Sequence, residues 1–179
     1  MAKRVADWRL PYPAKYITAH YGEMSAFRKA NNMQPHSGTD WARPRGTRIP
    51  AIAKGTIRLI QFSKVLGWVV VQTAMDKDGK VWYIGYCHMD FKPGYAVGQK
   101  LRKGQTVGKI GNTGQSSGPH LHATASRTPK GVFGVTSAKV DLYKLILANT
   151  KRATAQQANP QAPSVVQPVE VCKCCKRPL

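Results

Sequence analysis

The run of short apolar segments between residues 49 and 125 constrains the fold more than any other feature of this chain. Segments such as LGWVVVQTAM and KVWYIGYCHM are rich in β-branched and aromatic residues. Glycine-containing turns separate them about every 8 to 12 residues, a spacing typical of sandwiches and barrels built from short strands. We therefore predict an all-β fold, an antiparallel barrel-sandwich.

One turn in this region has a specific signature. The stretch MDKDGKVW places Asp-Gly between two apolar runs, which predicts a β-hairpin. The same letters resemble the opening of a calcium-binding loop, but the third acidic position and the distal glutamate of such a loop are missing. We predict the turn and no calcium site.

Helical periodicity is clear in one segment, AKVDLYKLILANT at residues 138–150. Its apolar side chains form one broad face, so we predict a single C-terminal helix. The apolar positions are Val140, Leu142, Tyr143, Ile146 and Leu147. The stretch GEMSAFRKANNM, residues 22–33, is a weaker candidate and is predicted to be a loop with one turn.

The composition changes after Thr150, where the chain becomes rich in Ala, Gln and Pro and poor in core-forming residues. A chain of 179 residues is long enough for one good core. We therefore divide it into one domain over residues 1–149, a linker over residues 150–171 and a short basic tail over residues 172–179.

The tail contains three of the four cysteines, Cys172, Cys174 and Cys175. Thiolates are soft metal ligands, but structural zinc sites use four ligands in two separated pairs. The pattern favours a flexible basic tail and leaves a zinc knuckle as the alternative. The uneven cysteine spacing does not suggest a disulfide framework, so we expect synthesis in a reducing compartment.

The charge of the chain is strongly positive: 28 Lys and Arg against 8 Asp and Glu give a formal net charge of +20. The segment after Thr150 has five basic residues and one acidic residue, so residues 1–150 have a formal net charge of +16. A cationic body predicts a polyanionic partner, such as nucleic acid, an anionic membrane or a bacterial wall with its phosphate polymers and carboxylates. Charge alone does not choose among them.

The chain has neither the apolar run of a signal peptide near its start nor a stretch long enough to span a bilayer. We therefore expect a soluble protein that is made in the cytoplasm and has no membrane span.

Two histidines one residue apart, His120 and His122 in GPHLHATAS, are candidate metal ligands. In a strand they point to the same face and reach one cavity. Such a pair is weak evidence on its own, because a half-buried strand with polar positions looks the same. The segment PHSGTDW adds His36 and Asp40, whose even separation in an extended chain again puts both on one side. With one more histidine they would make a three-ligand set that leaves a fourth zinc position for water.

A further histidine, His88 in YIGYCHMD, ends a predicted strand. A lone histidine is usually a structural one. However, the chain has only five histidines, and His20 is the only one outside these three motifs.

These residues and their surroundings resemble the lysostaphin-like peptidoglycan metalloendopeptidases, also called LytM-type domains, over residues 10–146. ITAHYG is similar to the entry strand of that family, and HSGTDWARPRGTRIPAIAKGTI to its first ligand motif and the glycine-bounded run after it. YCHM is similar to its Tyr-x-His-Leu element, and VGQKLRKGQTVGKIGNTGQSSGPHLH to its glycine-spaced approach to His-x-His.

The resemblance implies a barrel-sandwich of the duplicated hybrid motif type, with the site in a groove flanked by loops. It implies that His36, Asp40 and His122 bind one zinc ion and that His88 and His120 are the two catalytic imidazoles beside it. The stretch GNTGQSSG, residues 111–118, is either a loop that lines this groove or a plain polar turn.

Two positions depart from the family pattern. The family usually continues His-Leu-His-Phe-Glu, whereas this chain has Ala123 and Thr124, so a contact behind the histidine pair is expected to differ. Cys87 stands beside His88 and is interpreted as buried packing. Neither change removes a ligand.

The leading hypothesis is a monomeric zinc endopeptidase that cuts a stem-peptide or cross-bridge bond of bacterial peptidoglycan and binds anionic wall polymers. It is expected to be a phage-type lysin released to the wall or a wall-piercing virion component. Alternatives are a non-catalytic LytM-type domain that binds the wall or regulates a hydrolase, and a cationic β-barrel that binds nucleic acid. No recognisable nucleic-acid motif supports the last alternative.

Overall fold

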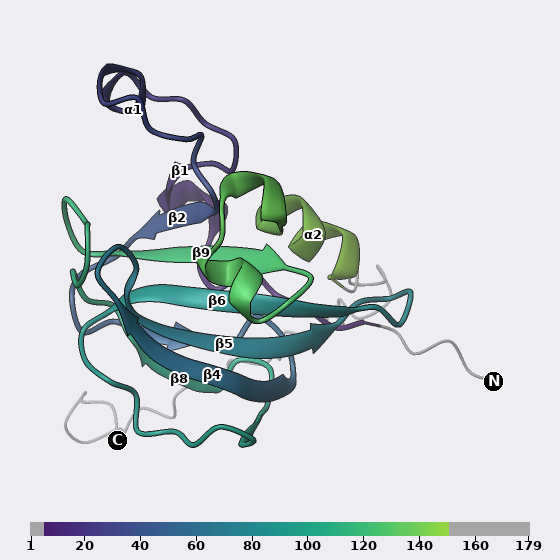
Figure 1. Cartoon of the computed structure of the whole chain (residues 1–179). Coiled ribbons are helices and arrows are strands. Elements are labelled where there is room, and N and C mark those ends of the chain that lie inside the picture. The colour runs from purple at the N-terminus through teal and green to yellow at the C-terminus, as the bar shows by residue number, and fades with distance from the viewer. Residues whose placement is uncertain (1–5, 151–179) are drawn as a thin grey trace, which may run out of the picture.

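Two antiparallel sheets form most of the computed structural model, which describes residues 6–150. The larger sheet has eight strands in the order β1-β2-β9-β6-β5-β4-β7, with β10 paired to β9, and the smaller sheet pairs β3 with β8 (Figure 1). The predicted all-β antiparallel fold is therefore confirmed.

The strands are β1 (Ile17–Ala19), β2 (Thr39–Ala42), β3 (Arg48–Pro50), β4 (Gly55–Ser63), β5 (Gly67–Met75), β6 (Val81–Met89), β7 (Lys100–Leu101), β8 (Thr106–Lys109), β9 (His120–Ser126) and β10 (Lys139–Val140). The helices are α1 (Ala26–Ala30) and α2 (Leu142–Asn149), and three short 3-10 turns are η1 (Ala14–Tyr16), η2 (Lys130–Phe133) and η3 (Thr136–Ala138).

Strand β5 is apolar on both faces because both faces are covered. Val70 packs into the main core, which joins residues of the large sheet to Ile49 and Val107 of the small sheet. Val69 and Val71 point the other way, into a second cluster closed by Val132 of η2. This double burial explains why the sequence of β5 shows a continuous apolar run instead of a clean alternation.

The predicted Asp-Gly hairpin connects β5 to β6, with Met75 paired to Val81. Gly79 takes a φ of 79°, a left-handed conformation that glycine adopts without steric cost. The Asp76 carboxylate accepts hydrogen bonds from the backbone N–H groups of Asp78 and Lys80. The acidic residue therefore stabilises the turn, as the sequence predicted, and is not part of a calcium loop.

The C-terminal helix is present but shorter than its apolar pattern suggests. Asp141 caps α2 by accepting a hydrogen bond from the backbone N–H of Lys144 at 3.1 Å, so Val140 belongs to β10 instead. Leu142 and Ile146 are fully buried, whereas Leu147 is 51% exposed. Leu147 belongs to the predicted apolar face but lies toward solvent, because the helix touches the sheet along a narrower stripe.

The weaker helical candidate, residues 22–33, contains the single short helix α1, in agreement with the predicted loop with one turn. Neither helix in the described part of the chain is long and apolar enough to cross a membrane. Apart from Thr150, the predicted linker over residues 150–171 lies outside the described residues, as does the whole predicted tail over residues 172–179.

Candidate metal centre and groove

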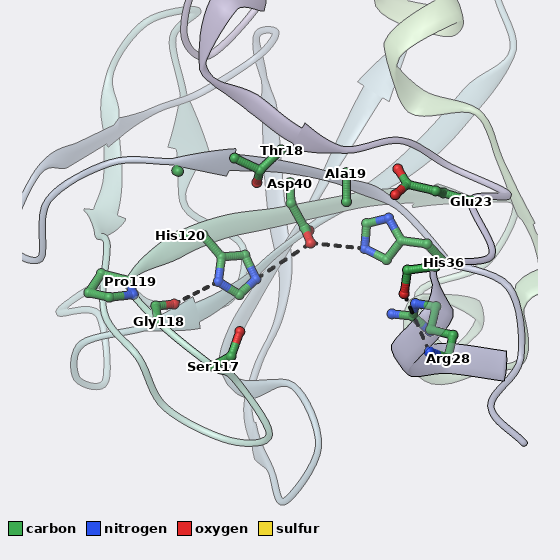
Figure 2. A pocket seen from close by; sticks show the side chains of 12 residues that line it. Thr18, Ala19, Glu23, Arg28, His36, Asp40, Ser117, Gly118, Pro119 and His120 are labelled. Carbon is green, nitrogen blue, oxygen red and sulfur yellow. Dashed lines mark hydrogen bonds and ion pairs between the residues drawn. The ribbon is translucent and has the colours of Figure 1, made fainter. Parts of the chain in front are cut away.

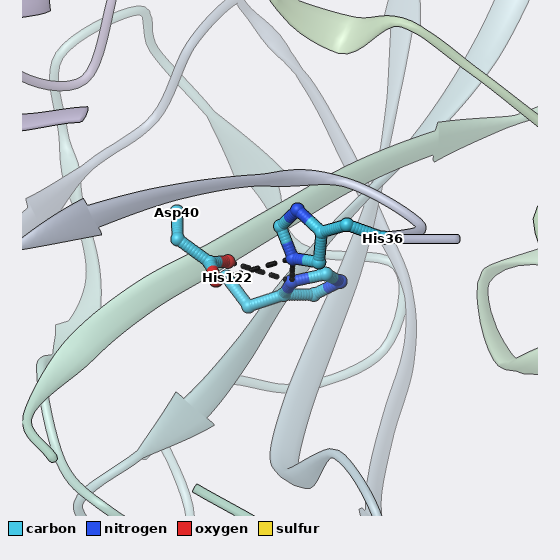
Figure 3. A group of neighbouring side chains, drawn as sticks. All are labelled: His36, Asp40 and His122. Atoms are coloured by element: carbon cyan, nitrogen blue, oxygen red, sulfur yellow. Dashed lines mark hydrogen bonds and ion pairs between the residues drawn. The ribbon is translucent and has the colours of Figure 1, made fainter. Parts of the chain in front are cut away.

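Strands β2 and β9 bring the candidate ligands together from distant parts of the sequence. In their antiparallel ladder Asp40 pairs with His122, and Ala42 pairs with His120. His36 lies just before β2 and is held by two backbone hydrogen bonds, from its N–H to the carbonyl of Glu23 and from the N–H of Gly22 to its carbonyl. The side chains of His36, Asp40 and His122 converge (Figure 3).

The ligand atoms of this group all lie within 4.8 Å of one another. His36 Nε2 is 3.1 Å from Asp40 Oδ2 and 3.1 Å from His122 Nδ1, and His122 Nδ1 is 2.8 Å from Asp40 Oδ1. His36 and His122 are almost completely buried, at 2% and 5% exposure. The arrangement matches a compact donor set of two imidazoles and one carboxylate.

A second contact fixes which nitrogen of His36 faces the group. His36 Nδ1 is 3.0 Å from the carbonyl oxygen of His20, which only accepts, so Nδ1 donates its proton there. In the neutral ring Nε2 then carries a lone pair directed at the Asp40 carboxylate. Two facing lone pairs repel each other unless a cation lies between them, so the donor set suits a metal ion.

The carboxylate at the centre of the group stays ionised. Burial by itself would raise the pKa of Asp40, but the imidazoles of His122 and His36 beside it outweigh burial and hold the pKa well below its ordinary value. Burial lowers the pKa of His122, and the Asp40 carboxylate opposes that effect only in part. A neutral imidazole beside an ionised carboxylate is the protonation state that metal binding requires.

The other two candidate histidines lie beside this group. The ring centroid of His88 is 4.7 Å from that of His120 and 5.9 Å from that of His122. The Nε2 atom of His120 is 3.8 Å from Asp40 Oδ2. The structure therefore brings together all five residues singled out in the sequence.

The loop over residues 111–118 orients both of these histidines through its backbone. His88 Nδ1 donates to the carbonyl of Thr113 at 2.7 Å, and His120 Nδ1 donates to the carbonyl of Gly118 at 2.8 Å. In the neutral form of each ring the proton therefore lies on Nδ1 and the lone pair on Nε2. Nε2 is the atom that each ring can use to accept a proton.

His88 has an unusual backbone and environment. Its φ of 57° is left-handed, a conformation uncommon for residues other than glycine. Burial, together with the neighbouring His122, lowers the pKa of His88 to about 4. His88 is therefore a neutral imidazole at neutral pH. Cys87 beside it is fully buried among apolar side chains, as predicted, and burial raises the pKa of its thiol to about 12.

A groove of about 400 Å³ opens over the group. Figure 2 shows His36, Asp40 and His120 along it, with Arg28 at one end and Gly118 near the other. The groove is also lined by Thr18, Ala19, Glu23, Ser25, Ala42, Ser117 and Pro119. Since two residues of the 111–118 loop line the groove, this loop is more than a plain polar turn.

The departure from the family pattern at position 124 has a structural role. The Thr124 hydroxyl donates to the carbonyl of Ser37 at 2.8 Å, and the buried Lys139 ammonium donates to the Ser37 hydroxyl at 3.0 Å. Both contacts hold Ser37, the residue that follows His36 in the chain. No sequence signal points to Lys139, which lies in the segment expected to be helical.

The structure is therefore an antiparallel β fold with a candidate His-Asp-His metal centre beside a groove. The sequence profile of Peptidase family M23 matches residues 34–132, which contain all five candidate residues. The chain belongs to Peptidase family M23.

Individual relatives agree with this assignment. The chain is 32% identical over 116 residues to the peptidoglycan DD-endopeptidase ShyA of Vibrio cholerae, an alignment that covers 64% of this chain and 26% of ShyA. The catalytic domain of lysostaphin from Staphylococcus simulans superimposes with a TM-score of 0.60 at 26% identity, covering 73% of this chain and 91% of that one. The catalytic domain of the prophage-encoded M23 protein EnpA of Enterococcus faecalis, as a single-residue mutant, gives a TM-score of 0.57 at 27% identity. The match covers 76% of this chain and 94% of that one.

The chain spans about a quarter of the length of ShyA and of the related DD-endopeptidase ShyC. The similarity therefore concerns one part of these longer proteins.

Proposed function

We propose that this chain is a zinc-dependent endopeptidase that hydrolyses a peptide bond in the stem peptide or cross-bridge of bacterial peptidoglycan. The observation that carries the proposal is the convergence of His36, Asp40 and His122 at a groove that also presents His120. The names of ShyA and ShyC, both peptidoglycan DD-endopeptidases, support the substrate class.

His36, Asp40 and His122 would hold the metal through His36 Nε2, an Asp40 carboxylate oxygen and His122 Nδ1, the atoms that face one another. A zinc ion with three protein ligands supplies a bound water with a pKa of about 7 and polarises a carbonyl group. Asp40 makes the site less positive than three histidines would.

His120 and His88 would transfer the protons of the reaction. His120 lines the groove, and a proton accepted at its Nε2 is stabilised by Asp40 Oδ2 at 3.8 Å. The His88 ring is held by Thr113 next to His120. Together they can take the proton of the attacking water and return it to the leaving amine.

The biological setting forms part of the proposal. Similarity to a prophage-encoded M23 protein supports a phage-type lytic enzyme or a virion component that acts at the wall. The strongly basic body supports a partner with anionic groups. We propose that the chain acts there as a monomer.

The experiment is digestion of several purified peptidoglycan types, followed by mass spectrometry of the soluble fragments. We expect fragments with new free amines, loss of release with a zinc chelator, and recovery when zinc is added back. The pair of fragments on either side of the new amine identifies the bond. If the zinc-loaded protein binds these walls without releasing fragments from any of them, the chain is a non-catalytic wall-binding or regulatory domain.

A further inference from the structure

A second groove of about 830 Å³ lies at the other end of the large sheet from the metal centre. It is formed by the β4–β7 ladder, the β5–β6 hairpin and the segment 6–8, and it shares no lining residue with the first groove. Its floor includes the buried side chains of Trp8, Ala74 and Leu101. The proposed catalytic chemistry uses no residue of this groove.

Three basic side chains, Lys54, Lys100 and Arg102, form one rim of this groove, and we call them the basic rim. Gly55 pairs with Leu101 in the β4–β7 ladder, so Lys54 and Arg102 lie next to the same pair of residues on adjacent strands. Lys100 and Arg102 flank the buried Leu101, and all three basic residues are exposed. Like charges on adjacent strands repel each other, so this cluster costs stability unless an anion is present.

The two acidic residues of the groove both contact groups outside the basic rim. Asp7 forms an ion pair with Lys103 at 2.6 Å. Asp76 accepts hydrogen bonds from the hairpin backbone and, at 2.8 Å, from Trp82 Nε1. Within residues 6–150, no ion pair includes a member of the basic rim. Its three charges therefore face solvent together.

The lining favours one kind of polyanion. Alternate residues of a strand are about 7 Å apart. This spacing suits a polymeric ligand that has one negative charge on each short repeating unit. Met75 and Val81, 40% and 38% exposed, offer aliphatic surface for C–H groups between the charges. Trp8, the only aromatic residue of the described lining, is 1% exposed and donates its Nε1 to the carbonyl of Met75. It therefore offers no face on which a nucleic-acid base can stack.

From this geometry we propose that the second groove binds a phosphodiester-linked polyol polymer of the bacterial wall. Phosphates would contact the basic rim and the polyol carbons would lie over the apolar floor. Such binding would keep the metal centre at a high local concentration of its substrate. The proposal goes beyond the endopeptidase function and does not need catalysis, so the two can fail separately.

The test compares two full-length triple variants that each lose three positive charges. One is K54Q/K100Q/R102Q, and the matched control is K64Q/K92Q/K130Q, which removes exposed lysines outside the second groove. Binding is measured to purified poly(glycerol phosphate) and to walls before and after chemical removal of their phosphodiester polymer, in the presence of chelator. Thermal unfolding verifies that both variants fold, and hydrolysis of a short soluble peptidoglycan fragment is measured separately.

We expect the rim variant to bind poly(glycerol phosphate) about tenfold more weakly, whereas the control changes by about twofold or less. The binding of the wild type to walls should also fall when the polymer is removed, and hydrolysis of the soluble fragment should be the same in all three proteins. Equal losses in both variants would show that net charge alone governs binding and would overturn the proposal. No loss in the rim variant, or tighter binding to single-stranded DNA than to poly(glycerol phosphate), would also overturn it.

Discussion

Asp40 and His122 stand directly opposite each other in the β2–β9 ladder, with Asp40 Oδ1 2.8 Å from His122 Nδ1. Directly paired residues of an antiparallel sheet have neighbouring Cβ atoms. The geometry of the candidate metal centre is therefore fixed by the register of two strands, and any change that separates them disturbs the ligands.

Gly38 is the first place where this dependence can be tested. A Cβ atom there would lie 2.5 Å from the carbonyl oxygen of Ala123 and 2.7 Å from His122 Cε1. Because the first of these atoms is backbone, we expect Gly38→Ala to push β2 and β9 apart, to destabilise the fold by about 2 kcal/mol or more and to weaken zinc binding. Thermal unfolding and a zinc titration measure both effects. Gly94→Ala is the control, since a Cβ there meets nothing within 4 Å; equal behaviour of the two variants would contradict the account.

The proposed roles of the histidines separate zinc binding from turnover. We expect His88→Ala to keep zinc and lose nearly all peptidoglycan hydrolysis, because its side chain is not among the three converging ligands. His36→Ala should lose zinc and activity together. His20→Ala is the matched control, since His20 contributes its backbone carbonyl to the site and its ring packs against Tyr143. Full activity in His88→Ala would exclude its proposed role.

We expect the hydroxyl of Thr124 to influence the candidate metal ligand His36 through the neighbouring residue Ser37. Thr124→Val removes the hydrogen bond to the Ser37 carbonyl and leaves that oxygen without this donor. We expect zinc affinity to fall about tenfold, as for other contacts that orient metal ligands, while Thr124→Ser restores it. If zinc affinity stays the same in Thr124→Val, the hydroxyl serves the fold alone.

Asp76 gives a prediction for stability that does not involve the metal. Burial would raise its pKa, but hydrogen bonds from Trp82 and from the backbone of Lys80 and Asp78 lower it below the ordinary value. Asp76→Ala loses these bonds and should cost about 3 kcal/mol of unfolding free energy. Asp78→Ala, which loses only an exposed ion pair with Lys77, should cost less than about 1 kcal/mol.

The pH dependence of this effect follows from the sign of the shift. A carboxylate whose pKa is lower in the folded state stabilises the fold above its unfolded pKa, which is about 4, and loses that contribution as the pH falls further. The stability difference between wild type and Asp76→Asn should therefore be large at pH 7 and shrink below pH 4. Urea unfolding at both pH values measures it, and a difference that grows in acid would contradict the assignment.

The strands and the hairpin could be predicted because each has a local signature, whereas the five candidate residues were singled out by short motifs together with a family resemblance. Apolar runs between glycines mark strands, and His-x-His places two rings on one face of β9 whatever the fold around it. The limits of the C-terminal helix were harder to predict. Asp141 directly follows β10 and caps α2. Only packing against the sheet determines that Leu147 faces solvent.

The contacts that orient the site could not be predicted in this way. The carbonyls of His20, Thr113 and Gly118 fix the tautomers of three histidines, but every residue has a carbonyl, so the sequence does not mark them. Lys139 reaches Ser37 across more than one hundred residues of sequence, and only the pairing of β10 with β9 places it there. Long-range pairing of this kind leaves no periodic pattern.

The most direct test of the metal centre is zinc stoichiometry by native mass spectrometry on the full chain. Cys172, Cys174 and Cys175 are replaced by serine in all samples, because thiolates also bind zinc. We predict one zinc ion per chain for this protein and none after the further change Asp40→Ala or His122→Ala. An ion retained by both of these variants, or no zinc bound to the parent at saturating concentration, would contradict the proposed His36, Asp40 and His122 site.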